Sequence, residues 1–293
     1  MKTGAKILWF WVMATATGLA CLTLPEFATG KPAAEDKVAT VNGSVITQEE
    51  LDREVIVQKP EKHLIKDTSK DFHTQFGVIK KEFFSSEDGA KTKTGNQEYK
   101  LLSPSFIDLY MNIERLAQII PLKDIGPIIT FTGMNKESKI LDAGSGSGGL
   151  SLFLASIAKE VHTYDVKEEH TSLVRKNTEF LGMDNIKAET ASIYEADKIK
   201  EKDFDIFTLD VPEPWKAVGT AEKKLKTGGF LVCYSPCIPP LSEFLEAVKK
   251  NDKFDVIRTI EIIERDWEFE GRKIRPKSSQ IGHSGFLSFV RKI

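Results

Sequence analysis

Short apolar runs alternate with amphipathic stretches along the second half of the chain. The apolar runs predict strands at 139–142, 160–164, 186–189, 204–210, 229–234, 255–263 and 284–290. The amphipathic stretches predict helices at 148–158, 168–181, 215–225 and 240–250. Strands that alternate with helices are typical of a parallel sheet with helices on both faces. The pattern therefore predicts an α/β fold with a Rossmann-like sheet in this half of the chain.

The region before this alternation has a different pattern. Residues 57–104 contain short polar segments broken by glycine and proline, which predicts a small β domain built from hairpins. The stretch that follows, "SPSFIDLYMNIERLAQII", predicts one helix, which Ser103 or Ser105 caps and Pro121 ends. We therefore expect a small β domain at 57–104 and the α/β domain at 105–293.

The start of the chain differs from both regions. Two lysines precede an uncharged run that ends at Pro25, which predicts a secretory signal peptide or a membrane anchor within residues 1–30. Residues 31–56 include "KVATVNGSVITQEELDREV", which predicts a strand, an Asn-Gly turn, a second strand and a capped helix. This stretch resembles the opening of secreted parvulin-type isomerases and related chaperones. On its own it indicates an envelope chaperone without enzymatic activity.

Composition and charge exclude few classes of function. The formal net charge is −2, so the whole-chain balance gives no argument for a nucleic-acid partner, and any basic surface has to be a local patch. The three cysteines are too few and odd in number for a disulfide framework. The five histidines are scattered, and no Cys/His spacing is typical of zinc. We therefore predict no metal site.

The stretch "KILDAGSGSGGLSLFLA" joins the end of a buried strand, a glycine-rich turn and a helix start. Glycine has no Cβ, so a turn of this kind lets a ligand approach the backbone closely. The helix start adds unpaired N–H groups and a partial positive charge. Dinucleotide enzymes and methyltransferases both use this arrangement, and a tight turn without a ligand is the third interpretation. The glycines concerned are Gly144, Gly146, Gly148 and Gly149.

Two details of this stretch favour S-adenosylmethionine over NAD as the ligand. Asp142 precedes the first glycine, where it can meet the cationic amino-acid end of S-adenosylmethionine. The pair Gly148-Gly149 crowds the helix start and leaves no evident opening of the size of a pyrophosphate. Asp165, at the end of the next strand, could accept hydrogen bonds from both ribose hydroxyls of either cofactor.

A second candidate acid lies in "FDIFTLDVPEPWKAV". Asp210 ends a buried apolar strand, and two prolines stiffen the chain that follows. Ligands of open α/β sheets bind in the crevice at the carboxyl ends of the strands, so Asp210 and the glycine turn should face the same crevice. The alternative is that Asp210 only caps the helix after it.

Several segments together resemble the tRNA (adenine-N1) methyltransferases, which make 1-methyladenosine in the T-loop of tRNA. The resemblance covers roughly residues 60–293 and rests on "DFHTQFGVI", "ERLAQIIPLKD", "LDAGSGSGGLSLFLA", "LDVPEPWK", "FLVCYSP" and "RDWEFEGRKIRPKSSQIGHSGFLSFVRK". It implies a small N-terminal β domain followed by a Rossmann-like methyltransferase domain, S-adenosylmethionine as cofactor, tRNA as partner and a homotetramer. A methyltransferase of another substrate is the alternative within the same fold.

The resemblance also implies roles for single residues. The family's active-site acid corresponds to Asp210. Its cofactor contacts correspond to Ser147, Gly148, Gly149, Leu150, Asp165, His170 and one of Tyr194 and Glu195. One departure stands out, because many relatives have tyrosine where this chain has Pro121.

The cofactor and the tRNA imply a cytoplasmic enzyme. The signal-like segment at 1–30 conflicts with this location, and contact with a membrane is expected only if that segment is retained.

Overall fold

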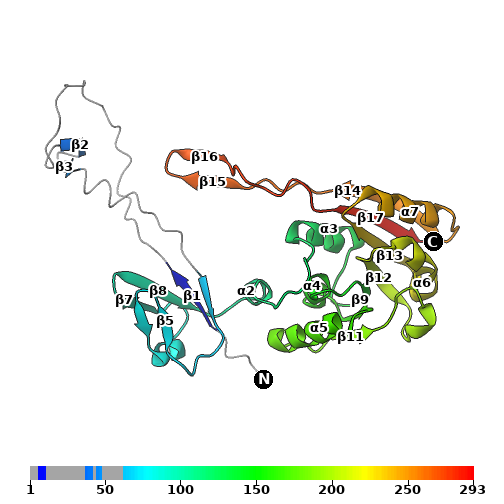
Figure 1. Cartoon of the computed structure of the whole chain (residues 1–293), viewed down its shortest axis with the longest axis horizontal. Coiled ribbons are helices and arrows are strands. Elements are labelled where there is room, and N and C mark those ends of the chain that lie inside the picture. The colour runs from blue at the N-terminus through cyan, green and yellow to red at the C-terminus, as the bar shows by residue number, and fades with distance from the viewer. Residues whose placement is uncertain (1–5, 11–36, 42–43, 48–61) are drawn as a thin grey trace. The chain divides into compact units, whose positions relative to one another are not determined.

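The computed structural model describes residues 6–10, 37–41, 44–47 and 62–293 (Figure 1). These residues form two compact units, of which the first ends at Asp108 and the second begins at Leu109. No helix among the described residues is long and apolar enough to cross a membrane.

The first unit contains a four-stranded antiparallel sheet with the strand order β4-β1-β8-β7. Every second residue of β8 is buried, which places Tyr99 and Leu101 in a small core with Ile65, Ile79 and Phe84. The strands are β1 (Lys6–Phe10), β4 (Lys62–Ile65), β7 (Lys91–Thr94) and β8 (Gln97–Leu102), and beside them lie the hairpin β5 (Phe72–Thr74) and β6 (Gly77–Ile79) and the short helix η1 (Lys81–Ser85).

The strand β1 lies within the apolar run that the sequence predicts to be a signal peptide or anchor. It pairs with β4 on one side, where Lys6 faces Ile65, and with β8 on the other, where Ile7 faces Leu102. It is therefore an internal strand of the sheet. A second hairpin, β2 (Lys37–Val41) and β3 (Ser44–Thr47), occupies the two strand positions predicted within 31–56. The rest of the predictions for 1–56 lie outside the described residues.

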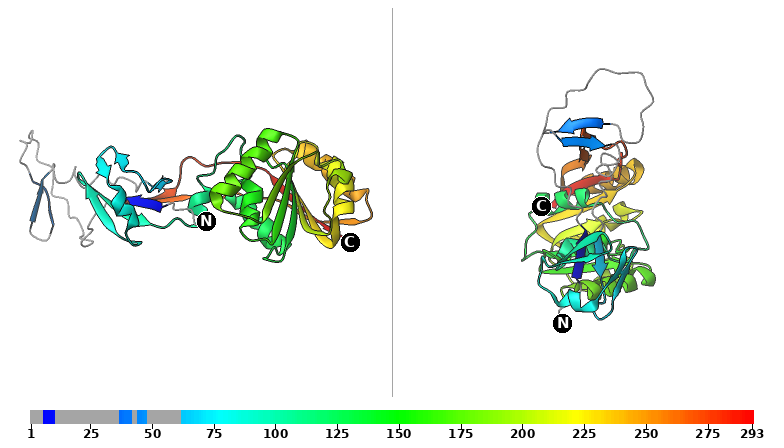
Figure 2. Two further views of the ribbon diagram at one scale, coloured as in Figure 1. Left: turned by 90° about the horizontal axis from the view of Figure 1, so that it is seen from below. Right: turned by 90° about the vertical axis from the view of Figure 1, so that its left-hand side faces the viewer.

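The second unit contains a seven-stranded sheet with the order β11-β10-β9-β12-β13-β17-β14. Figure 2 shows α4 and α5 on one face of this sheet and α6 and α7 on the other. The strands are β9 (Lys139–Ala143), β10 (Glu160–Asp165), β11 (Ile186–Thr190), β12 (Phe204–Leu209), β13 (Leu225–Ser235), β14 (Phe254–Glu261) and β17 (Phe286–Lys292). The helices are α4 (Gly149–Ala155), α5 (Glu168–Leu181), α6 (Val218–Lys224) and α7 (Ile238–Lys249), with short 3₁₀ turns at η2 (Ala196–Lys198) and η3 (Pro214–Ala217). The predicted α/β fold is confirmed.

The sheet is mixed, so the expectation of a parallel sheet was wrong for its last strand. β17 runs antiparallel to both of its neighbours, β13 and β14. The chain leaves β14 through the hairpin β15 (Trp267–Glu270) and β16 (Lys273–Pro276) and returns without a helical crossover. A parallel neighbour would need such a crossover, and therefore β17 returns antiparallel.

The helix predicted between Ser103 and Pro121 was also wrong. Only α2 (Phe106–Tyr110) is helical, and the chain then runs without regular structure to Pro121. The next helix, α3 (Leu122–Thr132), was not predicted, and it contains Gly126 and Pro127, two residues that disfavour helix interiors. Amphipathic spacing therefore placed the long helix before Pro121, whereas in the structure it follows Pro121.

Candidate active site

A cavity of about 410 Å³ lies at the carboxyl ends of β9, β10 and β12. The predicted residues Gly144, Gly146, Ser147, Gly149, Leu150, Asp165, His170, Tyr194 and Asp210 line it. The predicted residues Asp142, Gly148 and Glu195 do not. The cavity also has a wall that the sequence reasoning did not assign, formed by Ala117, Gln118, Ile119 and Ile120. Most predicted positions, which are far apart in the sequence, therefore meet around one space.

The glycine turn has little room for side chains. A Cβ on Gly144, whose φ is +91°, would lie 1.9 Å from the carbonyl oxygen of Asp210. A Cβ on Gly149 would lie 2.5 Å from the Cβ of Ile119. The turn is thus pressed between two other segments of the cavity wall, and glycine is required there whether or not a ligand is bound.

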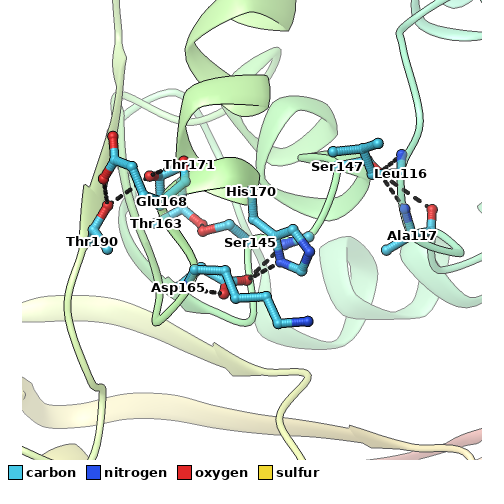
Figure 3. A network of polar contacts seen from close by, with 12 residues as sticks. Leu116, Ala117, Ser145, Ser147, Thr163, Asp165, Glu168, His170, Thr171 and Thr190 are labelled. Carbon is cyan, nitrogen blue, oxygen red and sulfur yellow. Dashed lines mark hydrogen bonds and ion pairs between the residues drawn. The ribbon is translucent and has the colours of Figure 1, made fainter.

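Asp165 is held at the end of β10 by three hydrogen-bond partners (Figure 3). Its Oδ2 accepts a hydrogen bond from the Gly146 N–H at 3.1 Å and lies 2.9 Å from His170 Nδ1, while its Oδ1 accepts one from the Lys167 N–H at 3.0 Å. This carboxylate joins the glycine turn to the start of α5. It is positioned to accept hydrogen bonds from vicinal hydroxyls, as the ribose of a nucleoside carries.

Asp142 lies beneath the turn and not on the cavity wall. Its two carboxylate oxygens accept hydrogen bonds from the hydroxyls of Thr163 and Thr208, each at 2.6 Å. Burial raises its pKa to about 6, although both hydroxyls act to lower it. The side chain therefore ties three neighbouring strands together, whereas the sequence pattern suggested a contact with the amino-acid end of the cofactor.

Asp210 directly follows β12, and its N–H donates to the carbonyl of Ala143 at 2.9 Å. Burial raises the pKa of Asp210 to about 7, and the nearby charge of Asp142 acts in the same direction. A carboxyl group with this pKa can be ionised or protonated near neutral pH. A cation in the cavity would favour the ionised form.

The wall of residues 117–120 belongs to the segment that was predicted to be helical, which is why it was missed. The family-like stretch "ERLAQIIPLKD" includes all four of these residues, so the sequence did carry a signal for this wall.

The segment that continues from this wall is fixed by a buried ion pair. The Lys123 ammonium donates to Asp124 Oδ1 at 2.8 Å, to the Ile262 carbonyl at 2.7 Å and to Ser284 Oγ at 2.5 Å. Ser284 Oγ in turn donates to Asp124 Oδ2 at 2.7 Å. Ile262 and Ser284 lie on either side of the hairpin β15–β16, so this ion pair holds both ends of the hairpin at the start of α3.

His283 belongs to the same junction. Its Nε2 lies 2.9 Å from the carbonyl oxygen of Pro236, and its Nδ1 lies 2.5 Å from Glu261 Oε1. The hydrogen bond with Glu261 is the main reason that the pKa of His283 is raised above its usual value. These contacts indicate a structural role.

Among the residues that the structure describes, no group of three or more His, Cys, Asp or Glu side chains could hold a metal ion.

Comparisons with known proteins identify relatives of this arrangement. Residues 101–285 match the family described as tRNA methyltransferase complex GCD14 subunit. The chain is 29% identical over 268 residues to the tRNA (adenine(57)-N(1)/adenine(58)-N(1))-methyltransferase TrmI of Methanocaldococcus jannaschii, an alignment that covers 81% of this chain and 93% of the relative. It is 30% identical over 227 residues to a tRNA (adenine(58)-N(1))-methyltransferase TrmI of Thermus thermophilus, covering 75% and 88%.

Two solved structures are similar over most of the chain. The tRNA (m1A58) methyltransferase TrmI of Aquifex aeolicus has a TM-score of 0.68 and 25% identity and covers 80% of this chain and 93% of its own. A SAM-dependent O-methyltransferase of Thermotoga maritima has a TM-score of 0.72 and 28% identity and covers 80% and 89%. The two structures share the fold but are named for different acceptor atoms.

Proposed function

Because this chain belongs to the family of the tRNA methyltransferase complex GCD14 subunit, we propose that it transfers a methyl group from S-adenosylmethionine to N1 of an adenine in the T-loop of tRNA. The observation that carries this proposal is the overlap between the family match and the cavity. All residues that line the cavity, from Ala117 to Glu213, lie within the matched range 101–285.

The cavity fits the cofactor in size and in polar groups. S-adenosylmethionine supplies an electrophilic methyl group on a positively charged sulfur. We propose that Asp165 binds the ribose hydroxyls and that His170 and the Gly146 N–H keep its carboxylate in place. Glycine-turn residues and Tyr194 would complete the binding site. We assign Asp142 and Glu195 only indirect roles, since neither lines the cavity.

Methyl transfer to adenine N1 needs few catalytic groups from the protein. Adenine N1 is unprotonated at neutral pH, so the enzyme does not need a general base to free its lone pair. The methylated base is a cation, and a carboxylate that accepts a hydrogen bond from the adenine amino group would stabilise the charge as it develops. We propose that Asp210 is this carboxylate. N1 lies on the Watson–Crick edge, so the base has to leave its stack to enter the cavity.

The test measures methylation of an unmodified tRNA transcript with methyl-labelled S-adenosylmethionine, followed by nucleoside analysis. We expect labelled 1-methyladenosine. Asp210→Ala should lower kcat about 100- to 1000-fold, because it removes one group that stabilises transition-state charge. Near-normal turnover of this variant would remove Asp210 from the mechanism.

The same assay separates the alternatives. A label on a 2′-O-methylated nucleoside would indicate the oxygen acceptor suggested by the Thermotoga maritima structure. Cofactor binding without labelled tRNA would indicate another substrate. Absence of S-adenosylmethionine binding would contradict the enzyme proposal and leave the chaperone interpretation of the chain start.

We also propose that the protein is a homotetramer and that the hairpin β15–β16 contributes to its interfaces. Trp267, Phe269 and Ile274 on this hairpin are 52%, 75% and 63% exposed, although such side chains are usually buried. The Dictyostelium discoideum relative is named a catalytic subunit, so assembly with further chains is a feature of relatives.

We propose a cytoplasmic location, because tRNA and S-adenosylmethionine are found there. The internal position of β1 supports this, since removal of residues 1–30 as a signal peptide would take the middle out of the small sheet. We propose that β1 and residues 57–104 form the small β domain and that residues 105–293 form the methyltransferase domain, a boundary four residues before the one between the two compact units.

A further inference from the structure

Residues 114–121, here called the strap, have no regular secondary structure, and residues 117–120 within it form one wall of the cavity. Apart from the Pro121 carbonyl, which accepts hydrogen bonds from the first turn of α3, the strap takes part in no helix or strand ladder among the described residues. Backbone groups in its first half, from Glu114 to Ala117, are bound by two buried polar side chains from other elements, Asn177 of α5 and Ser147 of the glycine turn. Both side chains are only 1% exposed.

The side-chain amide of Asn177 binds the strap through both its oxygen and its nitrogen. Its Oδ1 accepts a hydrogen bond from the Glu114 N–H at 3.0 Å, and its Nδ2 donates to the Glu114 carbonyl at 2.9 Å. The same Nδ2 donates to the carbonyl of Ser147 at 3.0 Å. One amide therefore joins the start of the strap, the glycine turn and α5.

Ser147 holds the next part of the strap (Figure 3). Its hydroxyl oxygen accepts hydrogen bonds from the N–H groups of Leu116 and Ala117 at 2.9 and 3.0 Å, and it lies 3.2 Å from the Ala117 carbonyl. The hydroxyl is thus occupied by the strap. The Ile119 side chain then packs where a Cβ of residue 149 would otherwise be.

We propose that Asn177 and Ser147 are positioning residues, which hold the strap against the glycine turn and thereby set the affinity for S-adenosylmethionine. This inference rests on the proposed function of the cavity. A strap released from these two side chains would expose its backbone groups to water, and the cavity would lose the wall formed by residues 117–120. Neither residue needs to touch the cofactor to have this effect.

Asn177→Asp gives the sharpest test, and Asn185→Asp is its matched control. In the first variant a carboxylate oxygen replaces Nδ2 and faces the carbonyls of Glu114 and Ser147. Asn185 likewise donates to two carbonyls, those of Ala155 and Ala158 at 2.8 and 3.0 Å, but it does not contact the strap. Both variants lose the same kind of hydrogen bonds, and only one loses them on the strap.

The measurements are the Kd for S-adenosylmethionine by calorimetry, amide hydrogen exchange of the strap, and Tm. We expect Asn177→Asp to weaken cofactor binding about 10-fold or more and to speed exchange at Leu116 and Ala117. The defect should shrink as pH falls, because a protonated carboxyl can donate to one of the carbonyls. Asn185→Asp should lower Tm and leave the Kd within about 2-fold of wild type.

A second pair keeps the test decisive if Asn177→Asp does not fold. Ser147→Ala removes the strap's hydroxyl partner, while Ser151→Ala removes an equally buried hydroxyl in α4 that donates to the Gly148 carbonyl. Because Ser147 also lines the cavity, binding and strap exchange are measured together, and we expect weaker cofactor binding with faster exchange at Leu116 and Ala117 in the first variant alone. Cofactor binding by Ser147→Ala and Asn177→Asp that matches their controls would overturn the inference. Failure of the wild-type protein to bind S-adenosylmethionine would instead contradict the proposed function.

Discussion

Two carboxylates near the glycine turn, Asp142 and Asp210, have different surroundings and different roles. Asp142 is held by two threonine hydroxyls inside the sheet, whereas Asp210 lines the cavity. Burial raises both pKa values, to about 6 for Asp142 and about 7 for Asp210, and the charge of Asp142 raises the pKa of Asp210 further. The charge of Asp142 therefore contributes to the protonation equilibrium of Asp210.

This coupling predicts a pH effect of Asp142→Asn. If the ionised Asp210 stabilises the product cation, the rate should rise as pH increases through about 7 in the wild-type protein. Removing the Asp142 charge lowers the pKa of Asp210, so the rising limb of kcat against pH should move to lower pH. The measurement is single-turnover methylation across the neutral pH range.

The exposed carboxylate Asp184 provides the control for this experiment, since it does not line the cavity. Asp184→Asn should leave the rising part of the kcat–pH profile at its wild-type pH. If kcat of Asp142→Asn rises at the same pH as in the wild-type protein, the charge of Asp142 does not affect the carboxylate that controls the rate.

At the scale of elements, sequence patterns succeeded where local and tertiary preferences agree. The glycine turn, the strands β9, β10 and β12 and the helix α5 are all predicted from apolar spacing and glycine positions, and they bring Asp165 and Asp210 to one sheet edge. The parallel direction of these strands follows from the same βαβ pattern.

The strap and α3 could not be predicted in this way. The strap has helical spacing, but the buried amide of Asn177 and the hydroxyl of Ser147 compete for its backbone groups. Those partners lie 30 or more residues away in the sequence, so no local pattern reveals them. α3 forms despite Pro127 because its first turn is held by the buried pair Lys123 and Asp124.

That ion pair predicts a large and separable effect on stability. Lys123→Met leaves the Asp124 carboxylate buried without its charged partner, which should lower the free energy of unfolding by about 3–5 kcal/mol. The double variant Lys123→Met with Asp124→Leu removes both charges and should recover much of this loss. Urea unfolding of the two variants measures the difference, and equal losses would mean that the unpaired Asp124 charge is not the cause of the loss.

At the scale of the whole molecule, the hairpin β15–β16 projects apolar side chains that the described residues do not cover. If the hairpin lies in the interfaces of the proposed tetramer, replacing Phe269 and Ile274 by glutamate should yield smaller species, because burying two unpaired carboxylates in an interface is costly. Light scattering after size-exclusion chromatography measures the mass. A double glutamate variant with the same mass as the wild-type assembly would exclude this hairpin from the interfaces.

The pairing of β1 with β4 has a consequence for how the chain start can be changed. Trp9 faces Lys62 across these antiparallel strands, so the chain leaves the sheet after residue 10 and re-enters it beside the point of departure. Proteins tolerate inserted sequences well where two strand ends lie next to each other. The ends of β1 and β4 are therefore placed as the two strands of a hairpin, and residues 11–61 connect them in the sequence.

This connecting segment should be exchangeable. Replacement of residues 11–60 by Asn-Gly, the dipeptide favoured in two-residue hairpins, keeps the register in which Trp9 faces Lys62 and should leave a folded protein that still methylates tRNA. Deletion of residues 1–61 should instead lower the stability of the small sheet, because it also removes the internal strand. If thermal unfolding and activity were the same for both proteins, β1 would be dispensable. If they differ as expected, the turn between β1 and β4 is a permissive site into which other sequences can be grafted.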